Sequence, residues 1–479
     1  MAERGDRPNI LLLMTDQQRG DALGLAGHPV LQTPYLDALG AEGVFFRRAY
    51  SACPICVAAR RTLMTGRRPV SHGVFANYNT RLFGPTLPGE LAAAGYQTHL
   101  VGKLHLWPLR ARYGFQSMDW ADSPFPRHDD DYQRWLRREG FNAPGAAVAH
   151  GANGNGWVAR PFHLEERFHF TNWCADRAIE FLERRDPTAP FFLKVSFHQP
   201  HQPCTPPRDY YERYMAMDLP EPEVGDWARV FDRPQRGLSV VAGWRVCLEP
   251  ALMRQYRAAY YGCINHIDDQ IGRILAAIPR NTIVVFTSDH GEMLGDHQWT
   301  RKRNAYEASA HIPLLMRFPA GLGIRPGQAC DQPVELMDLM PTLLETAGVP
   351  VPESVEGRSV LPLVRGEPAE WRAYLHGECS DVATMNSGMQ YLTDGRRKYI
   401  WFPGQGREQY FDLEADPREM RDLAASPDRA AEIAIWRERL VRELEGRPEG
   451  FVESGRLAKL SGPTAPCLPG YEQTRTASL

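Results

Sequence analysis

Short runs of consecutive apolar residues alternate with helix-like segments along the first part of the chain. The apolar runs cover residues 9–14, 97–101, 190–195 and 282–287. Runs of this length without polar alternation are typical of parallel strands that are buried on both faces. Two intervening segments, residues 33–43 and 170–185, carry apolar residues at helical spacing, and Thr33 is placed to cap the first. This alternation predicts an α/β fold around a mostly parallel sheet.

Polar and titratable residues follow each of the four runs. In chain order they are Thr15, Asp16 and Gln17; Gly102, Lys103 and His105; His198 and His201; and Ser288, Asp289, His290 and Gly291. The carboxyl ends of parallel strands meet at one edge of a sheet, where ligands of open α/β folds bind. The sequence therefore predicts an active site that combines acidic, cationic and imidazole groups.

The pattern changes from about residue 371. Short segments in which polar and apolar residues alternate lie at residues 389–393, 397–402 and 410–413. A charged helix is expected after them, at residues 430–445. These segments predict a small antiparallel sheet with one helix, packed on the active-site side of the main sheet. We therefore expect a catalytic α/β domain at residues 1–370 and a smaller C-terminal α+β domain at residues 371–479.

Two segments rich in glycine or proline, residues 143–155 and 203–234, interrupt the regular pattern. We expect them to form long surface loops that shape a substrate pocket. Aromatic residues in or near these loops are candidates to contact an aryl, sugar or quaternary ammonium group, with burial in the core as the alternative. They are Trp157, Tyr210, Tyr211 and Trp227.

Composition narrows the classes of partner. The 479 residues carry a net charge of −3, which gives no electrostatic reason to expect nucleic acid or an anionic membrane. The chain has no apolar run long enough to span a membrane, and residues 1–8 lack the apolar stretch of a signal peptide. Nine scattered cysteines favour a reducing, cytoplasmic location. Only five of the 55 basic residues are lysines, and Lys103 and Lys302 are two of them.

The segment after Cys56 has the most specific local pattern. Good helix formers fill residues 58–64 and Gly66 suits a helix C-terminus, so Cys56 is expected at a helix N-terminus. That position lowers the pKa of a thiol, and Arg60 lies one turn further on. A buried structural cysteine is the alternative. Cys53 and Cys56 also form a C-x-x-C pair, but no second pair with zinc-ligand spacing accompanies it.

This segment resembles the sulfatase signature, C-x-[P/A]-x-R followed by x-x-L-x-T-G. The residues that fit in register are Cys56, Ala58, Arg60, Leu63, Thr65 and Gly66. The resemblance continues, in the family's order, at residues 8–17, 102–105, 200–203, 287–297 and 410–417. It implies an alkaline-phosphatase-like sheet sandwiched by helices, with a smaller C-terminal antiparallel sheet plus helix. It also implies an enzyme that hydrolyses sulfate monoesters of small organic molecules.

The resemblance implies one divalent metal ion, Ca²⁺ or Mn²⁺. The matching ligands are Asp16, Gln17, Asp289 and His290, with the modified Cys56 completing the site. Many sulfatases have an aspartate where this chain has Gln17 and an asparagine where it has His290. These differences remove a negative charge and add a nitrogen donor, which favours Mn²⁺ over Ca²⁺ and leaves the metal open.

The resemblance also implies a mechanism. Cys56 is oxidised to formylglycine, whose hydrated aldehyde attacks sulfur or phosphorus with one hydroxyl and expels the anion with the other. Arg60 and Lys103 hold the diol, and His105 accepts its proton as the aldehyde re-forms. His201 and Lys302 contact the transferred anion and the leaving oxygen. Asn77 is a further candidate for a substrate contact, and the alternative is that it is a polar loop residue without such a role.

Three functions stay open at this point. A sulfatase is favoured because phosphonate monoester hydrolases of this superfamily tend to lack the Lys103-x-His105 element, and the alternative is a phosphodiesterase or phosphonate monoester hydrolase at the same site. A non-catalytic anion-binding protein with unmodified Cys56 is the third. Ala58 in place of the signature proline implies a radical-type formylglycine-generating maturase as partner. Family members often associate, so a homo-oligomer is also expected.

Overall fold

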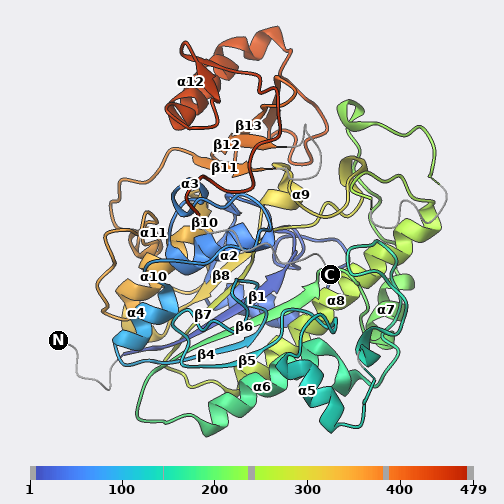
Figure 1. The fold of residues 1–479 in the computed structure, drawn as a ribbon, viewed down its shortest axis with the longest axis vertical. Coiled ribbons are helices and arrows are strands. Elements are labelled where there is room, and N and C mark those ends of the chain that lie inside the picture. The colour runs from blue at the N-terminus through green and yellow to red at the C-terminus, as the bar shows by residue number, and fades with distance from the viewer. Residues whose placement is uncertain (1–6, 144, 236–242, 381–387, 472–479) are drawn as a thin grey trace.

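The computed structural model describes residues 7–143, 145–235, 243–380 and 388–471 (Figure 1). An eight-stranded sheet forms its centre, in the order β5-β4-β6-β1-β7-β8-β2-β9. The four central strands are parallel: β4 (Gln97–Gly102), β6 (Phe191–Pro200), β1 (Asn9–Asp16) and β7 (Thr282–Ser288). They correspond to the four apolar runs, which confirms the predicted α/β fold.

The outer strands are shorter: β5 (Ser117–Trp120), β8 (Leu314–Arg317), β2 (Val44–Phe46) and β9 (Gln328–Cys330). Strand β8 runs antiparallel to both β7 and β2, so the sheet is mixed at this edge. A separate pair consists of β3 (Ala49–Tyr50) and β10 (Val334–Glu335).

Helices cover both faces of the large sheet (Figure 1). Ile10, Leu12 and Met14 of β1 belong to the hydrophobic core on one face, and Leu11 and Leu13 belong to the core on the other. The first face is covered by α2 (Cys56–Thr65), α4 (Leu87–Ala93), α10 (Leu339–Thr346) and α11 (Leu361–Arg365), while α3 (Pro69–His72) contacts α2. The second is covered by α1 (Pro34–Ala41), α5 (Asp131–Arg138), α6 (Phe170–Arg184) and α8 (Pro250–Ala277). Burial on both faces explains why the strand sequences do not alternate.

The two predicted helices are α1 and α6, and Thr33 occupies the predicted N-cap position of α1, but its side chain makes no capping hydrogen bond. The Thr33 hydroxyl donates to Asp37 (2.9 Å) and accepts from the Gly24 amide. The first amides of α1, at Tyr35 and Leu36, donate instead to Asp268 on α8 (3.1 and 2.8 Å). A tertiary contact has replaced the local cap.

The C-terminal part forms a four-stranded antiparallel sheet with a helix, as predicted. Its elements are β11 (Leu375–Cys379), β12 (Met389–Thr393), β13 (Arg397–Phe402), β14 (Arg407–Asp412) and α12 (Ala430–Leu444), followed by the hairpin β15 (Val452–Glu453) and β16 (Arg456–Leu457). Helix α12 packs on one face of this sheet. The other face packs on the segment before Cys56, where the Glu378 amide donates to Ala52 (2.7 Å) and the Tyr391 hydroxyl to Ser51 (2.8 Å). The division into two domains at residue 371 stays a prediction.

The expectation that residues 203–234 form a loop is partly wrong. The segment contains α7 (Arg208–Met215), which packs on α8 through the buried Tyr214. The remaining short helix, α9 (Glu307–Ala310), lies beneath the C-terminal sheet (Figure 1).

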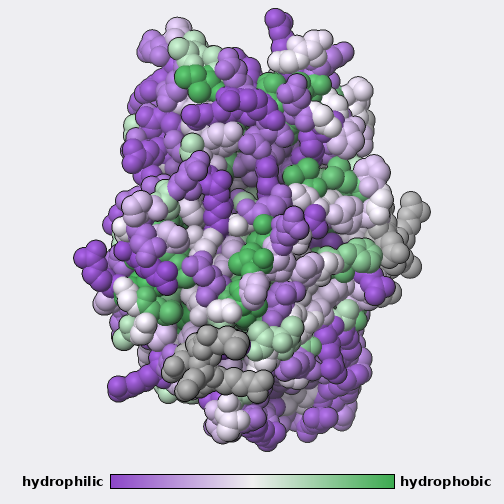
Figure 2. Space-filling model, turned by 90° about the vertical axis from the view of Figure 1, so that its left-hand side faces the viewer, coloured by the Kyte–Doolittle hydropathy of each residue, from purple (hydrophilic) through white to green (hydrophobic). Residues whose placement is uncertain are grey.

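The described surface is mainly hydrophilic on the face that Figure 2 shows, where hydrophobic residues form small separate groups. Among the helices of the described ranges, none combines the length and apolar character needed to cross a membrane.

Candidate active site

The polar residues that follow the four central strands lie together at one edge of the sheet. Asp16 ends β1, and Asp289 and His290 follow β7. The His201 amide donates to the Asp16 carbonyl (3.1 Å), and the Lys103 amide donates to the Ser196 carbonyl of β6 (2.8 Å). These backbone contacts tie the ends of β1, β4 and β6 to one another. The predicted convergence at the carboxyl edge is confirmed.

Helix α2 brings Cys56 to this edge. The helix begins at Cys56, after Ile55 in extended conformation, and Gly66 ends it with φ of 63°. All ten residues of the helix are buried. The Cys56 Sγ atom lies 3.2 Å from His290 Nε2 and 3.8 Å from Asp16 Oδ1. The predicted helix N-terminus is therefore confirmed, and it places the cysteine among the acidic and imidazole side chains.

Asp16, Cys56, Asp289 and His290 form the one cluster of possible metal ligands found in the described part of the chain. Their ligand atoms lie within 4.8 Å of one another, and all four residues are buried. Burial and the neighbouring Asp16 raise the pKa of the Asp289 carboxyl. Two buried carboxylates at this distance repel each other, and a divalent cation would relieve the repulsion. The oxygen and nitrogen donors therefore fit a divalent metal ion, without selecting Ca²⁺ or Mn²⁺.

Arg60 and Lys103 balance the negative charge of the Asp16 and Asp289 carboxylates. The fully buried Arg60 guanidinium contacts Asp289 (Nε, 2.9 Å), Asp16 (Nη2, 3.0 Å) and the Ser196 hydroxyl (Nη1, 2.9 Å). Lys103 Nζ lies 2.7 Å from Asp16 Oδ2. Although burial acts in the opposite direction, these cations hold the pKa of Asp16 well below its usual value. Arg60 and Lys103 thus orient the two candidate metal-ligand carboxylates, and a contact with a modified Cys56 stays a prediction.

Gln17 lies next to the cluster with its side chain paired to other groups. Its Oε1 accepts from Lys302 Nζ (2.6 Å), while its Nε2 donates to Gln202 Oε1 (2.8 Å) and to Glu292. Its backbone amide donates to Asp289 Oδ1 (3.1 Å). A metal-ligand role for Gln17 stays a prediction. In that role, Gln17 Oε1 would release the Lys302 ammonium and bind the metal ion instead.

The cluster opens into a cavity of about 1030 Å³ that is lined by Cys56, Lys103, His105, His201 and Lys302. Burial and Asp16 raise the pKa of the Cys56 thiol, but the ammonium groups of Lys302 and Lys103 outweigh them and hold this pKa well below its usual value. The cationic groups therefore stabilise a negative charge at the Cys56 side chain.

Two histidines on the cavity wall have different hydrogen-bonding states. His201 Nδ1 donates to the Gln202 carbonyl (2.8 Å), which leaves Nε2 as the acceptor in the neutral ring. Burial and Lys302 hold the pKa of His201 well below its usual value, so the neutral ring is favoured. His105 Nδ1 is buried without a hydrogen-bond partner among the described residues, and the His105 amide donates to Asp122 (2.8 Å). Each histidine thus has a nitrogen available to a proton or a substrate.

Asn77 lines the same cavity but has a local role. Its Oδ1 accepts from the Val57 amide (2.9 Å), one of the first amides of α2. The side chain therefore caps the helix that carries Cys56. Its predicted contact with substrate stays a prediction.

The aromatic residues expected at the pocket do not line it. Trp157, Tyr210, Tyr211 and Trp227 are absent from the described lining, and Trp227 packs on His297, Tyr306 and Phe411. The aromatic wall is instead formed by Trp107, Phe125 and Trp244. Of the two expected loops, only residues 143–155 contribute, through Gly154 and Asn155. Trp107 lies two residues after the candidate catalytic His105 in the sequence, and this short separation could have predicted Trp107 as part of the cavity wall.

Arginines on the cavity wall were also missed. They are Arg127, Arg301 and Arg303. Arg301 and Arg303 flank Lys302 in the sequence, so their position beside a candidate catalytic lysine was visible before the structure.

Comparisons with known proteins agree with the fold. The sulfatase family model matches residues 8–349, and a model described as N-sulphoglucosamine sulphohydrolase, C-terminal, matches residues 295–445. An arylsulfatase from Clostridium perfringens is 41% identical over 480 residues, covering 95% of this chain and 98% of that protein. A choline-sulfatase from Rhizobium meliloti is 29% identical, covering 88% and 83%. The crystal structure of a phosphonate monoester hydrolase from Agrobacterium radiobacter superimposes with a TM-score of 0.77 at 28% identity, covering 91% and 95%.

The fold and these matches define a hydrolase of the alkaline phosphatase superfamily. Within it, the chain belongs to the sulfatase family and is a sulfuric ester hydrolase.

Proposed function

We propose that the protein hydrolyses a sulfate monoester of a small organic molecule, with Cys56, after conversion to formylglycine, as the nucleophilic residue. The observation that carries this proposal is the position of Cys56. It starts α2 inside a buried group of possible metal ligands and faces the cavity that Lys103, His105, His201 and Lys302 line. The similarity to an arylsulfatase supports a sulfate ester as substrate.

The residues fit one divalent ion held by Asp16, Gln17, Asp289 and His290 with the modified Cys56. When present, the ion and the hydrated formylglycine would supply charge stabilisation and a hydroxyl nucleophile. Whether the ion is Ca²⁺ or Mn²⁺ stays open.

The other side chains of the site have separate roles in this proposal. Arg60 fixes Asp16 and Asp289 in one arrangement through charge-assisted hydrogen bonds. Lys302 and His201 face the cavity, where they bind the anionic ester and stabilise the leaving oxygen. His105, whose Nδ1 has no partner among the described residues, accepts a proton when the aldehyde is regenerated.

The same proposal extends to the partners of the protein. Ala58 supports maturation by a radical-type formylglycine-generating enzyme. We also propose a cytoplasmic location, association into a homo-oligomer and a division into domains at residue 371.

A phosphodiesterase or phosphonate monoester hydrolase activity is the second candidate. A relative named multifunctional alkaline phosphatase superfamily protein PehA, from Trinickia caryophylli, is 30% identical over 516 residues, covering 93% of this chain and 99% of that protein. The structural similarity to a phosphonate monoester hydrolase also favours it. Lys103 and His105, both on the cavity wall, favour the sulfate ester.

The experiment that decides is a comparison of kcat/KM for a matched aryl sulfate and aryl phosphodiester. The protein is produced together with a formylglycine-generating enzyme and loaded with Mn²⁺ or Ca²⁺. We expect a higher kcat/KM for the sulfate and loss of turnover on chelation. A phosphodiester rate that is higher by orders of magnitude would establish the second candidate instead.

A further inference from the structure

Glu292 is a buried carboxylate that the proposed function leaves without a role. It is fully buried and absent from the described lining of the cavity, so it is not placed to touch a substrate there. Its Oε1 accepts from the backbone amides of Leu294 (2.9 Å) and Arg301. Its Oε2 accepts from the side-chain amides of Gln17 and Gln202 (2.9 Å for Gln202). One carboxylate therefore joins a backbone segment to two glutamine side chains.

The orientation of the Gln17 amide is set by groups of opposite hydrogen-bonding character. Gln17 Oε1 accepts from Lys302 Nζ (2.6 Å), and an ammonium group only donates hydrogen bonds. Gln17 Nε2 donates to Glu292 and to Gln202 Oε1 (2.8 Å), and an ionised carboxylate only accepts. A half-turn of the amide would place its NH₂ group against the Lys302 ammonium and its oxygen against the Glu292 carboxylate. Glu292 therefore keeps Gln17 Oε1 on the side of Lys302.

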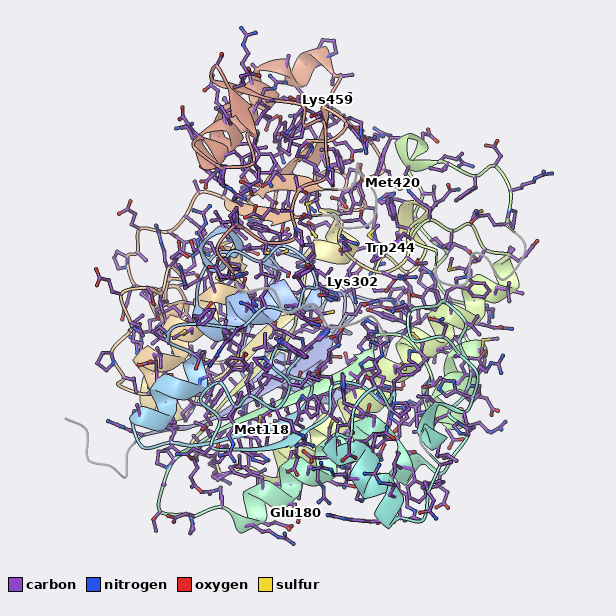
Figure 3. All side chains as sticks on the ribbon, in the orientation of Figure 1. Met118, Glu180, Trp244, Lys302, Met420 and Lys459 are labelled. Carbon is purple, nitrogen blue, oxygen red and sulfur yellow. The ribbon has the colours of Figure 1, made fainter. Side chains whose placement is uncertain are left out.

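Glu292 also holds the segment that carries Lys302. The Met293 amide donates to the Arg301 carbonyl (2.7 Å), while Glu292 accepts from the Arg301 amide. Arg301 has φ of 68°, a left-handed conformation that persists where surrounding contacts fix it. Burial lowers the pKa of the Arg301 guanidinium, and the charge of Glu292 acts against this lowering. Lys302 follows directly, below the C-terminal sheet (Figure 3). Both sides of the contact between Lys302 and Gln17 are thus attached to Glu292.

We propose that Glu292 is a positioning residue that keeps Gln17 Oε1 directed toward the metal-ligand cluster and thereby sets the affinity for the metal ion. This inference rests on the proposed function, in which Gln17 is a metal ligand. The Gln202 side chain supports the same arrangement, since it accepts from Gln17 and donates to Glu292. In Glu292→Gln, an NH₂ group faces either the two backbone amides or the two glutamine amides, so one of the two attachments is lost.

Calorimetric titration of the metal-free protein with Mn²⁺ tests this role without turnover. We expect Glu292→Gln to weaken Mn²⁺ binding by about 10- to 100-fold, the range for residues that hydrogen-bond to metal ligands. Gln17→Met should cause a loss of similar size. In the Gln17→Met background, Glu292→Gln should add less than about twofold, because the carboxylate then has no ligand to orient. Equal losses from Glu292→Gln in both backgrounds would show that Glu292 acts by its charge alone and would overturn the inference.

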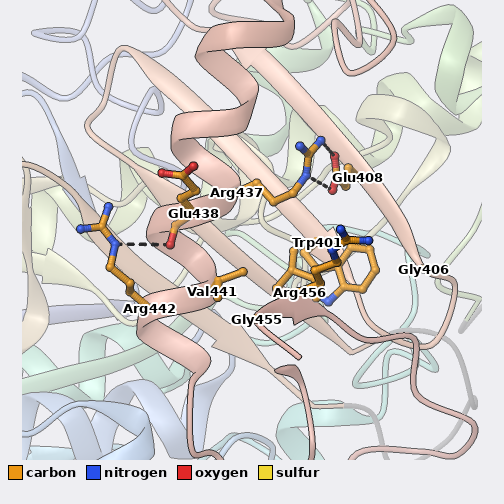
Figure 4. A pocket seen from close by; sticks show the side chains of 10 residues that line it. Trp401, Gly406, Glu408, Arg437, Glu438, Val441, Arg442, Gly455 and Arg456 are labelled. Carbon is orange, nitrogen blue, oxygen red and sulfur yellow. Dashed lines mark hydrogen bonds and ion pairs between the residues drawn. The ribbon is translucent and has the colours of Figure 1, made fainter. Parts of the chain in front are cut away.

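Glu408→Gln is the matched control. Glu408 lines a cavity of about 680 Å³ in the C-terminal part, which shares none of its described lining residues with the first cavity (Figure 4). There it accepts two hydrogen bonds from Arg437 (2.6 and 2.7 Å). The substitution removes a hydrogen-bonded carboxylate in both cases, and Glu408→Gln should leave the Mn²⁺ affinity unchanged. If it weakened Mn²⁺ binding as much as Glu292→Gln does, the effect would be a general loss of stability and the inference would fail.

Urea unfolding of the metal-free protein provides a second measurement, which also serves if Glu292→Gln alone does not fold. Gln17→Glu should lower the urea midpoint of the wild type, because two buried carboxylates then face each other. The same change should raise the midpoint of Glu292→Gln, or restore its folding, because the new NH₂ group gains an acceptor. A lower midpoint in both backgrounds, or a double variant that does not fold, would contradict the inference. If the wild type binds neither Mn²⁺ nor Ca²⁺, the proposed function fails, while the two midpoints still decide whether Glu292 holds the Gln17 side chain.

Discussion

Arg60 is the residue whose replacement most sharply tests the architecture of the site. Its guanidinium joins carboxylates at the ends of two different strands, Asp16 at the end of β1 and Asp289 directly after β7. A lysine at this position keeps the charge but can approach only one of the two carboxylates closely. Arg60→Lys therefore leaves one of the two proposed metal-ligand carboxylates without its contact to the residue 60 side chain.

The size of the effect follows from these contacts. Residues that hydrogen-bond to metal ligands contribute about 10- to 100-fold to metal affinity or activity. Because Arg60 supports both carboxylates, we expect Arg60→Lys to weaken Mn²⁺ binding by about 100-fold, at the upper end of that range. The folded state should persist, since the buried charge is retained.

The assay is calorimetric titration of metal-free protein with Mn²⁺, followed by sulfate release at saturating Mn²⁺. Arg61→Lys is the matched control, because Arg61 is the next residue on α2, equally buried, and bonded to Thr80 instead of the cluster. An Arg60→Lys protein that binds Mn²⁺ within about twofold of the wild type would refute the assigned role, since the expected loss is 10- to 100-fold.

Three further predictions follow from single contacts. Asn77→Ala should cost about 1 kcal/mol of stability in urea unfolding through the lost cap on Val57, with KM nearly unchanged; a large rise in KM would favour a substrate contact instead. Lys302→Arg should lower kcat about 100-fold without lowering Tm, because the planar group cannot replace an ammonium beside Gln17; full activity would contradict this. Lys194 is buried without a hydrogen-bond partner among the described residues, and burial lowers its pKa to about 7. The unfolded lysine stays protonated up to about pH 10, so the contribution of Lys194 to the free energy of unfolding should rise with pH from about 7 to 10. In urea unfolding, the difference in stability between the wild type and Lys194→Met should therefore shift in favour of the wild type over this range.

The sequence predicted the candidate site best where a residue's position is determined by the end of a strand. Each apolar run ends at a polar residue, so parallel pairing alone brought Asp16, Lys103, His201 and Asp289 to one edge. The helix at Cys56 was equally predictable, since good helix formers precede a glycine with positive φ. These features depend on local pattern and on the geometry of a sheet, which short stretches of sequence carry.

The substrate wall was not predictable in the same way. Trp244 and Trp107 come from segments without regular pattern, and their position at the cavity depends on long-range packing. Trp227, a candidate for that wall, packs instead on Tyr306 and Phe411. Thr33 illustrates the same limit, because the acceptor for the first amides of α1 is Asp268, more than two hundred residues away. Roles that depend on distant partners cannot be assigned from neighbours in the chain.

The most direct test of the central claim is sulfate release from an aryl sulfate by the wild-type protein and by Cys56→Ala. Both are loaded with the same metal, and mass spectrometry of the peptide that contains residue 56 reports the modification. We expect formylglycine in the wild type and sulfate release that disappears in the Cys56→Ala protein. Sulfate release at the wild-type rate by Cys56→Ala, or by a protein with unmodified cysteine at position 56, would contradict the account.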